Sequence, residues 1–437
     1  MIGFLHRLYA GFISPPEAPK TDSALRFGLL GASFIAPMAL ILPAKSHPEV
    51  IVACVAARDR VKAEKYAKEH GIPVVHDTYE DVINDPAVSC IYIALPNSHH
   101  YEWALRAVKA GKHVLLEKPS TSNASEAKKL FGNHLFAAPG APVLLEAFHY
   151  SFHPAWQIFL QLIHQDPLAG PVKIAYSQFF LYKGFLNRND PSEIRLRYAL
   201  AGGCGMDLSS YNVSHIRQML ADSHPNVQSA NFRMLSTSKP PLDEQDLKQI
   251  DEAVTATFKS ATGAEGRIVA DLSTAGGWPI IPASWSRNLP SIGWPKCVAE
   301  LGEKQIEDDT ELTDGETHVV QRTVTFYNHI APSMYHSIVV QDKHSIKRDV
   351  ETVHSWTQTR TVKAYDWPDK SDGRQGESWW TTYRYQLNEF VHHVKGRKGS
   401  GVWFSGQDSI DQMAVIDEMY EKGGLKARPS AAFESEP

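Results

Sequence analysis

Short apolar runs alternate with stretches of helical spacing over the first third of the chain. Residues 26–31, 51–56 and 89–95 are apolar at most positions, which is typical of strands covered on both faces. Residues 59–70 and 101–110 have the helical period, and each stretch is followed by a glycine that can end a helix. This alternation predicts an α/β domain of the Rossmann type, built on a doubly wound parallel sheet.

The pattern changes after about residue 152, where apolar and polar positions alternate more regularly. Such alternation predicts an α+β domain with a large, mostly antiparallel sheet that has one open face. The strand-like runs are 172–180, 253–258, 266–272, 319–326 and 345–350, and helical spacing returns at 383–396 and 409–422. We therefore divide the chain into an N-terminal arm (1–24), a Rossmann domain (25–150), a C-terminal domain (151–425) and a tail (426–437).

Charge and cysteine content exclude several classes of protein. The 437 residues carry a formal net charge of -5, which favours neither nucleic acid nor a membrane surface as a partner. Glycines and prolines interrupt the apolar stretch 27–44, so it is not predicted to span a membrane. Segment 1–14 is apolar and basic, but no small-residue cleavage pattern follows it, which favours an arm over a targeting peptide. Scattered cysteines without a Cys-x-x-Cys pair predict buried thiols in a reducing compartment, the cytoplasm, and no metal site.

The first predicted strand leads into a turn that suits a dinucleotide. Such a fold needs a tight turn, a close approach of the backbone to the pyrophosphate, and a helix N-terminus that faces the phosphates. The turn contains Gly31, Ala32, Ser33, Phe34 and Ile35. After the second strand stand Ala57 and Arg58, where an NAD enzyme usually has an acid for the ribose. Because a guanidinium pairs with a 2′-phosphate, we predict NADP as the cofactor, with NAD also possible.

Polar residues also follow the next strands of the predicted sheet. Ligands in such folds bind at the carboxyl edge of the sheet, so these residues are predicted to contact the dinucleotide. They are Leu95, Pro96, Asn97, His99 and His100 after one strand, Glu117 and Lys118 after the next, and Glu146 after the last. Lys118 would point into the crevice beside the nicotinamide, where an ammonium can position a substrate hydroxyl and share its proton.

These motifs resemble those of the Gfo/Idh/MocA oxidoreductase family. The resemblance rests on Glu117-Lys118-Pro119, the turn 96–99, the first βα turn and the segment 146–154 at the domain junction. The chain is similar in particular to NADP-dependent D-xylose 1-dehydrogenases and dimeric dihydrodiol dehydrogenases, and its arm looks like that of fungal members. The resemblance runs from about residue 25 to about residue 425 and is weakest between about 220 and 375.

The resemblance assigns the chemistry to Asp207 and Tyr211, which are four residues apart and so share one face of a predicted helix. It implies that Tyr211 is the general acid or base, made more acidic by the ammonium of Lys118, and that Asp207 orients a substrate hydroxyl. Further residues predicted for the substrate wall are Phe148, His149, His153, Arg188, His215 and Trp278. Ser151 stands where many xylose dehydrogenases carry arginine, which alters the expected wall and weakens xylose as the specific substrate.

Two functions remain open at this stage. The first is an oxidoreductase that moves hydride between nicotinamide and a carbon of a sugar, polyol or dihydrodiol, with Lys118 and Tyr211 handling the proton. A biosynthetic carbonyl or imine reductase is a variant of this function. The second is a non-catalytic, dinucleotide-binding regulator, which would have no use for Lys118, Asp207 and Tyr211 together. The expected partners are a small-molecule substrate and, as the resemblance implies, further copies of the chain bound through the C-terminal sheet.

Overall fold

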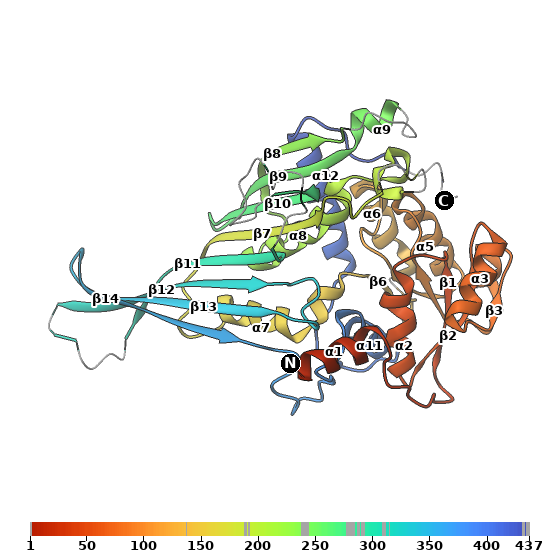
Figure 1. The fold of residues 1–437 in the computed structure, drawn as a ribbon, viewed down its shortest axis with the longest axis horizontal. Coiled ribbons are helices and arrows are strands. Elements are labelled where there is room, and N and C mark those ends of the chain that lie inside the picture. The colour runs from red at the N-terminus through yellow and green to blue at the C-terminus, as the bar shows by residue number, and fades with distance from the viewer. Residues whose placement is uncertain are drawn as a thin grey trace.

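A six-stranded parallel sheet and an eight-stranded sheet organise the chain (Figure 1). The structure is a computed structural model, and it describes residues 2–136, 138–187, 190, 193–236, 244–276, 285, 289, 293–307, 312–313, 315–430 and 433.

The parallel sheet has the strand order β3-β2-β1-β4-β5-β6, which confirms the predicted Rossmann class. Its strands are β1 (Leu25–Leu30), β2 (Val50–Ala56), β3 (Val74–Val75), β4 (Cys90–Ile93), β5 (His113–Leu116) and β6 (Leu144–Glu146). The helices between them are α2 (Leu42–Ser46), α3 (Arg60–His70), α4 (Tyr79–Asn84), α5 (His100–Lys109) and α6 (Ala124–Phe131). The strand order changes direction between β1 and β4, and ligands of such folds bind in the crevice that forms there.

Local interactions explain the geometry of the first two βα units. Gly31 follows β1 with a φ of +98°, and a Cβ at this position would lie 3.0 Å from a methyl group of Leu95. The helix expected directly after this turn begins only at a π-helical turn (Pro37–Ile41), which continues into α2. At the start of α3, the Asp59 side chain accepts a hydrogen bond from the backbone of Lys62, so the helix is capped where the sequence predicts.

The C-terminal domain is built on the eight-stranded sheet, in the order β14-β13-β12-β11-β7-β10-β9-β8. Its strands are β7 (Val172–Tyr182), β8 (Asn226–Met234), β9 (Asp251–Lys259), β10 (Glu265–Thr274), β11 (Lys296–Ile306), β12 (Glu316–Tyr327), β13 (Ser337–Arg348) and β14 (Glu351–Val362). Neighbouring strands are antiparallel except β7 and β10, which confirms the predicted mostly antiparallel sheet. The sequence pattern does not reveal β8, β11 or β14.

Helices cover one face of this sheet. Helix α8 (Cys204–Leu220) packs on β7, β9 and β10, and α7 (Pro154–His164) packs on β12. Along β9, β10 and β12 buried residues alternate with more exposed ones, so the opposite face is open as predicted. Helices α11 (Thr382–Val394) and α12 (Gly406–Lys422) return to the parallel-sheet domain and contact α2 and α6, and a short α9 (Glu244–Gln249) precedes β9.

The N-terminal arm begins with α1 (Ile2–Phe12), which lies on the surface. The guanidinium of Arg7 stacks on the ring of Tyr365 at 3.5 Å and donates to the backbone oxygen of Ser333 at 3.1 Å. Further along, Lys20 donates to three backbone oxygens at the end of α2. The arm is therefore tied to both domains. Among the described helices none combines the length and the apolar character that crossing a bilayer requires.

A fully buried ion pair fixes the start of α8. The side chains of Arg428 and Asp251 touch, and neither is exposed to solvent. Asp251 also accepts hydrogen bonds from the backbone of Gly205 at 2.6 Å and from the hydroxyl of Tyr420 at 3.1 Å. Arg428 donates in turn to the backbone oxygen of Gly202 at 2.7 Å. The C-terminal segment thus holds the helix that carries Asp207 and Tyr211.

Replacing Asp251 with asparagine leaves the guanidinium of Arg428 buried without a counter-charge. Removing one partner of a buried pair costs about 3–5 kcal/mol, so we expect the free energy of unfolding of Asp251→Asn, measured by urea titration, to fall by about that amount. Glu303→Gln is the control, because Glu303 pairs with Lys347 at the surface and such pairs contribute about 1 kcal/mol or less. Equal losses in the two variants would contradict the role of Asp251.

Candidate active site

A cavity of about 350 Å³ lies where the carboxyl ends of the parallel strands meet the C-terminal domain. The parallel-sheet domain contributes, among others, Ser33, Phe34, Ile35, Leu95, Asn97, His100, Glu117 and Lys118 to its lining. The C-terminal domain contributes, among others, Phe179, Leu181, Arg195, Asp207, Tyr211, Ile330 and Tyr383, and His149 lines the cavity at the junction between the domains. Lys118, Asp207 and Tyr211, which the sequence analysis singles out for chemistry, therefore line one cavity.

The ammonium group of Lys118 connects the two domains at this cavity. Lys118 follows β5, and its Nζ donates to Oδ1 of Asp207 at 2.7 Å and to the backbone oxygen of Asp207 at 3.1 Å. The same nitrogen lies 4.6 Å from the ring centre of Tyr211. A cation over an aromatic face is attracted by the quadrupole of the ring. Lys118 is thus held by three contacts, all from α8.

Asp207 lies half-buried between two cations. Its other carboxylate oxygen, Oδ2, lies 3.0 Å from Nε of Arg195. Burial by itself raises the pKa of the Asp207 carboxyl, but Lys118 and Arg195 together hold this pKa below its usual value. The carboxylate is therefore ionised at neutral pH.

The hydroxyl of Tyr211 points to a histidine rather than to Lys118. It lies 2.9 Å from Nε2 of His149, whose Nδ1 lies 2.8 Å from the hydroxyl oxygen of Thr382. Burial, with a smaller contribution from Lys118, lowers the pKa of His149 to about 3, so the imidazole is neutral. The neutral tautomer with its hydrogen on Nδ1 donates to Thr382 and accepts from Tyr211, and the other neutral tautomer reverses both hydrogen bonds.

The phenol of Tyr211 is a weaker acid than the sequence analysis expects. Burial raises its pKa well above the usual value, and the nearby Tyr383, Glu117 and Asp207 raise it further. The expectation that this phenol is more acidic than usual is therefore wrong. The reason is geometric, because the ammonium is paired with Asp207 and lies over the ring instead of beside the hydroxyl.

Residues behind Lys118 fix the strand ends that carry it. Glu117 is buried, burial raises its pKa, and its Oε1 accepts a hydrogen bond from the hydroxyl of Tyr92 at 2.7 Å. The two ring nitrogens of His100 lie 2.8 Å and 2.9 Å from the backbone oxygens of Pro119 and Leu95. These contacts join the loops after β4 and β5 at the edge of the cavity.

A second cavity of about 390 Å³ occupies the place expected for the adenosine end of a dinucleotide. Its lining includes the predicted residues Ala57, Arg58, Leu95, Pro96 and His99, together with Thr78, Tyr79 and Trp103. Arg58 is exposed and forms no ion pair with any described residue, whereas the acidic neighbours Asp77 and Glu80 are paired with Arg60 and Arg106. Arg58 is therefore available to an anionic ligand.

Several predicted residues lie outside the cavity lining. Gly31 and Ala32 begin the first βα turn, and Glu146 is buried, where its carboxylate accepts a hydrogen bond from the backbone of Ser120 at 2.8 Å. Phe148 is buried behind Tyr211, with 5.9 Å between the ring centres. His153 is buried and caps the start of α7. Arg188 and Trp278 lie outside the described residues.

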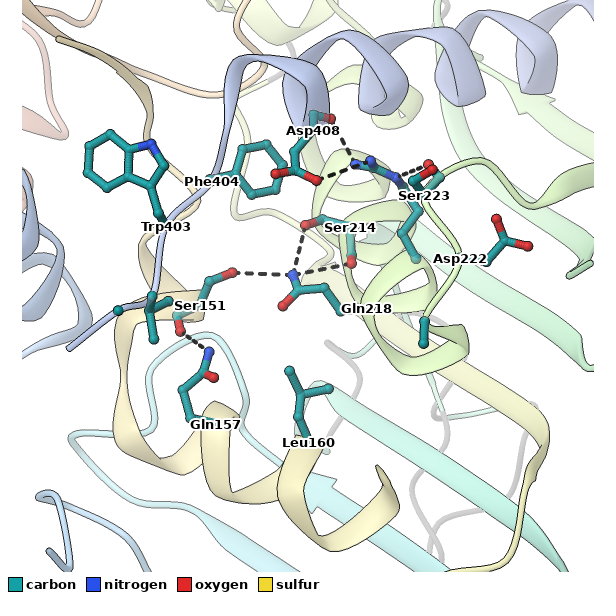
Figure 2. Close-up of a pocket in the computed structure, with 14 residues that line it drawn as sticks. Ser151, Gln157, Leu160, Ser214, Gln218, Asp222, Ser223, Trp403, Phe404 and Asp408 are labelled. Atoms are coloured by element: carbon teal, nitrogen blue, oxygen red, sulfur yellow. Dashed lines mark hydrogen bonds and ion pairs between the residues drawn. The ribbon is translucent and has the colours of Figure 1, made fainter. Parts of the chain in front are cut away.

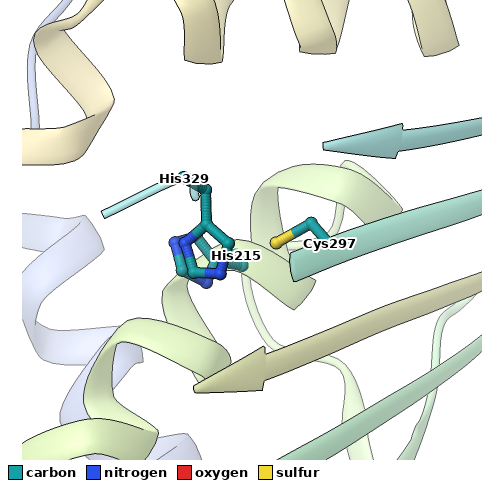
Figure 3. A group of neighbouring side chains, drawn as sticks. All are labelled: His215, Cys297 and His329. Carbon is teal, nitrogen blue, oxygen red and sulfur yellow. The ribbon is translucent and has the colours of Figure 1, made fainter. Parts of the chain in front are cut away.

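His215 also lies outside this lining, although it is one helical turn beyond Tyr211 on α8. It is fully buried in the C-terminal domain, beside His329 and Cys297 (Figure 3). Its Nδ1 lies 3.0 Å from the hydroxyl oxygen of Ser177, and the centres of the two imidazole rings are 4.3 Å apart. Its position fits packing in the core, not contact with a substrate in the cavity.

Ser151 does not alter the wall of the cavity either. It lines a separate cavity of about 380 Å³ on the other side of Tyr150, together with Ser214, Gln218 and Trp403 (Figure 2). The amide nitrogen of Gln218 lies within 3.4 Å of the hydroxyl oxygens of both serines. The sequence assigns no role in the site to Arg195, Thr382 or Tyr383. Arg195 lies in a short turn, and Thr382 and Tyr383 begin a distant helix, so no local pattern connects them with the site.

Comparisons with known proteins agree with this geometry. Residues 25–133 match the Gfo/Idh/MocA family, described as an oxidoreductase family with an NAD-binding Rossmann fold. D-xylose 1-dehydrogenase (NADP(+)) 2 from Haloferax volcanii is 35% identical over 196 residues, which cover 45% of this chain and 57% of that protein. Trans-1,2-dihydrobenzene-1,2-diol dehydrogenase from Oryctolagus cuniculus is 29% identical over 275 residues, which cover 63% of this chain and 73% of the relative. The first of these matches thus spans little more than half of the relative's length.

Solved structures support the fold over almost the whole chain. An aldose-aldose oxidoreductase from Caulobacter crescentus superposes with a TM-score of 0.63 at 16% identity, covering 92% of this chain and 98% of that one. A 3-ketoreductase from Actinomadura kijaniata, solved with NADP, gives a TM-score of 0.59 at 17% identity and covers 90% of this chain and 96% of its own. At these identities the likeness concerns the fold alone.

The buried histidines make the stability of the fold depend on pH. Burial lowers the pKa of His329 to about 3, whereas a histidine in an unfolded chain has a pKa of about 6.5. The unfolded state therefore binds more protons, and stability falls as the pH drops below about 6.5. We measure the free energy of unfolding by urea titration at about pH 7.5 and about pH 5.5. Between these two values we expect it to fall by about 1.4 kcal/mol less in His329→Gln than in the unmodified protein. The same pH dependence in both proteins would refute this linkage.

Proposed function

We propose that the chain is an NADP-dependent dehydrogenase or reductase of the Gfo/Idh/MocA oxidoreductase family, whose NAD-binding Rossmann fold residues 25–133 match. Its substrate is a sugar, a polyol or a cyclic dihydrodiol. The enzyme oxidises a carbon of this substrate that bears a hydroxyl, or reduces the corresponding carbonyl in the reverse direction. The observation that carries this proposal is the meeting of Lys118, Asp207 and Tyr211 in one cavity beside the dinucleotide turn.

The cavity can hold both parts of the reaction. Ser33, Phe34 and Ile35 of the first βα turn line it, and the second cavity around Arg58 continues beyond Leu95. Bound NADP(H) would accept or supply the hydride. The residues of the chain then have to bind the substrate oxygen, exclude water and carry one proton.

The proton is held on Tyr211. Because the pKa of its phenol is raised, the hydroxyl is protonated at neutral pH and can donate to a carbonyl oxygen during reduction. This hydroxyl lies 2.9 Å from Nε2 of His149, so it exchanges that contact for the substrate oxygen when it donates. The phenolate that remains takes up a proton from solvent once the product leaves. Lys118 donates a hydrogen bond to the same substrate oxygen and stabilises the negative charge that develops there.

Much of the remaining cavity lining is apolar. Phe179, Leu181 and Ile330 line the cavity, together with Phe185, Ile194, Leu200 and Leu208. A substrate that fits has oxygens along one edge and an apolar face on the other side. A ring with adjacent hydroxyls, such as a cyclic diol or a pyranose, meets this description.

The open face of the eight-stranded sheet supports assembly of the chain into homo-oligomers as part of this proposal. The edge strand β14 is exposed at most positions and projects from the body of the molecule (Figure 1). Four buried free cysteines fit the reducing conditions of the cytoplasm, the proposed location.

Lys118→Met and Tyr211→Phe test the assigned roles. Each variant loses a group that acts on the proton or on the developing charge, so we expect kcat/KM to fall by about 10²–10⁴-fold. The measurement is NADPH absorbance with D-xylose, other aldoses and trans-dihydrodiols as substrates, alongside NADPH binding by fluorescence, which both variants should retain. Lys62→Met and Tyr327→Phe, at exposed positions, are matched controls. Dinucleotide binding without turnover on any substrate of the panel would indicate a regulator instead.

Arg58→Ala tests the choice of cofactor. Losing a charge-assisted contact to the 2′-phosphate costs about 1.5–3 kcal/mol, which corresponds to a rise of roughly 10–150-fold in the Kd for NADPH. The Kd for NADH should change by less than about twofold, because NADH carries no 2′-phosphate. Arg60→Ala is the control, since Arg60 is occupied by Glu64 and Asp77. An equal loss for both cofactors would argue against Arg58 as the phosphate-binding residue.

A further inference from the structure

The Asp207 carboxylate has a second cationic partner outside the set that handles the proton. Oδ1 belongs to Lys118, whereas Oδ2 lies 3.0 Å from Nε of Arg195. Arg195 lines the cavity, and its Nη1 donates to both carboxylate oxygens of Glu193 at 3.0 Å and 3.2 Å. Its guanidinium therefore bridges two carboxylates with two of its nitrogens.

The loop that carries Arg195 is held against the start of α8. The backbone oxygen of Arg195 accepts a hydrogen bond from the backbone of Gly203 at 2.8 Å. Gly202 packs so closely that a Cβ there would lie 2.6 Å from the same oxygen. Further along the loop, Asp246 of α9 accepts hydrogen bonds from the backbone of Tyr198 at 2.6 Å and from Arg197 at 3.0 Å. Arg195 is thus placed by its backbone as well as by its ion pairs.

Without Arg195, one charge would have to keep Asp207 ionised. Burial favours the protonated carboxylic acid, and the charges and hydrogen bonds of Lys118 and Arg195 offset this effect. The other titratable groups near Asp207 do not help, because they are neutral or acidic. They are Glu117 after β5, Cys204 and Tyr211 on α8, and Tyr383 on α11. A protonated Asp207 would no longer hold the ammonium of Lys118 under the ring of Tyr211.

We propose that Arg195 is a positioning residue, which keeps Asp207 ionised and directed at Lys118 without touching the reacting atoms. This role rests on the proposed function of Lys118. The fork of a guanidinium serves it better than an ammonium does, since Nε and Nη1 engage Asp207 and Glu193 from one rigid plane.

The experiment compares Arg195→Gln, Arg195→Lys and Arg267→Gln. In Arg195→Gln the pKa of Asp207 rises, so the acid limb of the kcat profile moves to higher pH by about one unit or more. Because the carboxylate also loses the contact that directs it at Lys118, kcat at neutral pH falls at least about tenfold. Arg195→Lys restores the position of the acid limb but only part of kcat, because the charge returns without the fork. Arg267→Gln is the matched control, since Arg267 pairs with Glu265 at the surface, and it leaves the acid limb and kcat in place. NADPH binding, measured by fluorescence, is unchanged in all three.

A second measurement needs no substrate. The Asp207 carboxyl is titrated by ¹³C NMR in aspartate-labelled protein, with its resonance identified by its loss in Asp207→Asn. An upward shift of its titration midpoint in Arg195→Gln, and not in Arg267→Gln, supports the proposal. This result holds even if no substrate in the panel turns over, in which case the proposed function fails on its own. If Arg195→Gln folds, an unchanged titration midpoint and an unchanged acid limb overturn the role of Arg195. If it does not fold, full kcat in Arg195→Lys overturns this role.

Discussion

The ion pair between Lys118 and Asp207 is the interaction on which the candidate site depends. It joins residues that are 89 positions apart in the chain, one after a strand of the parallel sheet and one on the helix that covers the second sheet. A pair taken out of water repays its desolvation only when geometry is good and the remaining hydrogen-bonding groups are satisfied. Here the second hydrogen bond to the Asp207 backbone and the contact with Arg195 meet that condition. The pair thus fixes how the two domains face each other across the cavity.

Rigid elements on both sides support this pair. On one side, Glu117 and His100 join the ends of β4 and β5 by hydrogen bonds inside the protein. On the other, the buried pair of Asp251 and Arg428 holds the first turn of α8. A site built this way keeps its geometry before any ligand arrives, which lowers the reorganisation that a reaction has to overcome.

Some of this arrangement can be predicted from the sequence, and the physical reason is clear in each case. The parallel strands are buried on both faces and so stand out as apolar runs, and Asp207 and Tyr211 share a helix face because they are four residues apart. β14 is exposed on both faces, so its residues carry no hydrophobic alternation to detect. Arg195 lies in a single 3-10 turn (Ile194–Leu196), and its partner is determined by how that turn packs on α8, which no local pattern encodes.

The electrostatic state of Tyr211 shows a different limit of sequence-based prediction. An ammonium near a phenol lowers the pKa of the phenol, but burial raises it, and only the structure shows that burial wins here. The same geometry leaves Lys118 able to donate one more hydrogen bond. An ammonium has three hydrogens, and two of them point to oxygens of Asp207. In the proposed reaction the third donates to the substrate oxygen, so Lys118 polarises the substrate while its pair with Asp207 stays intact.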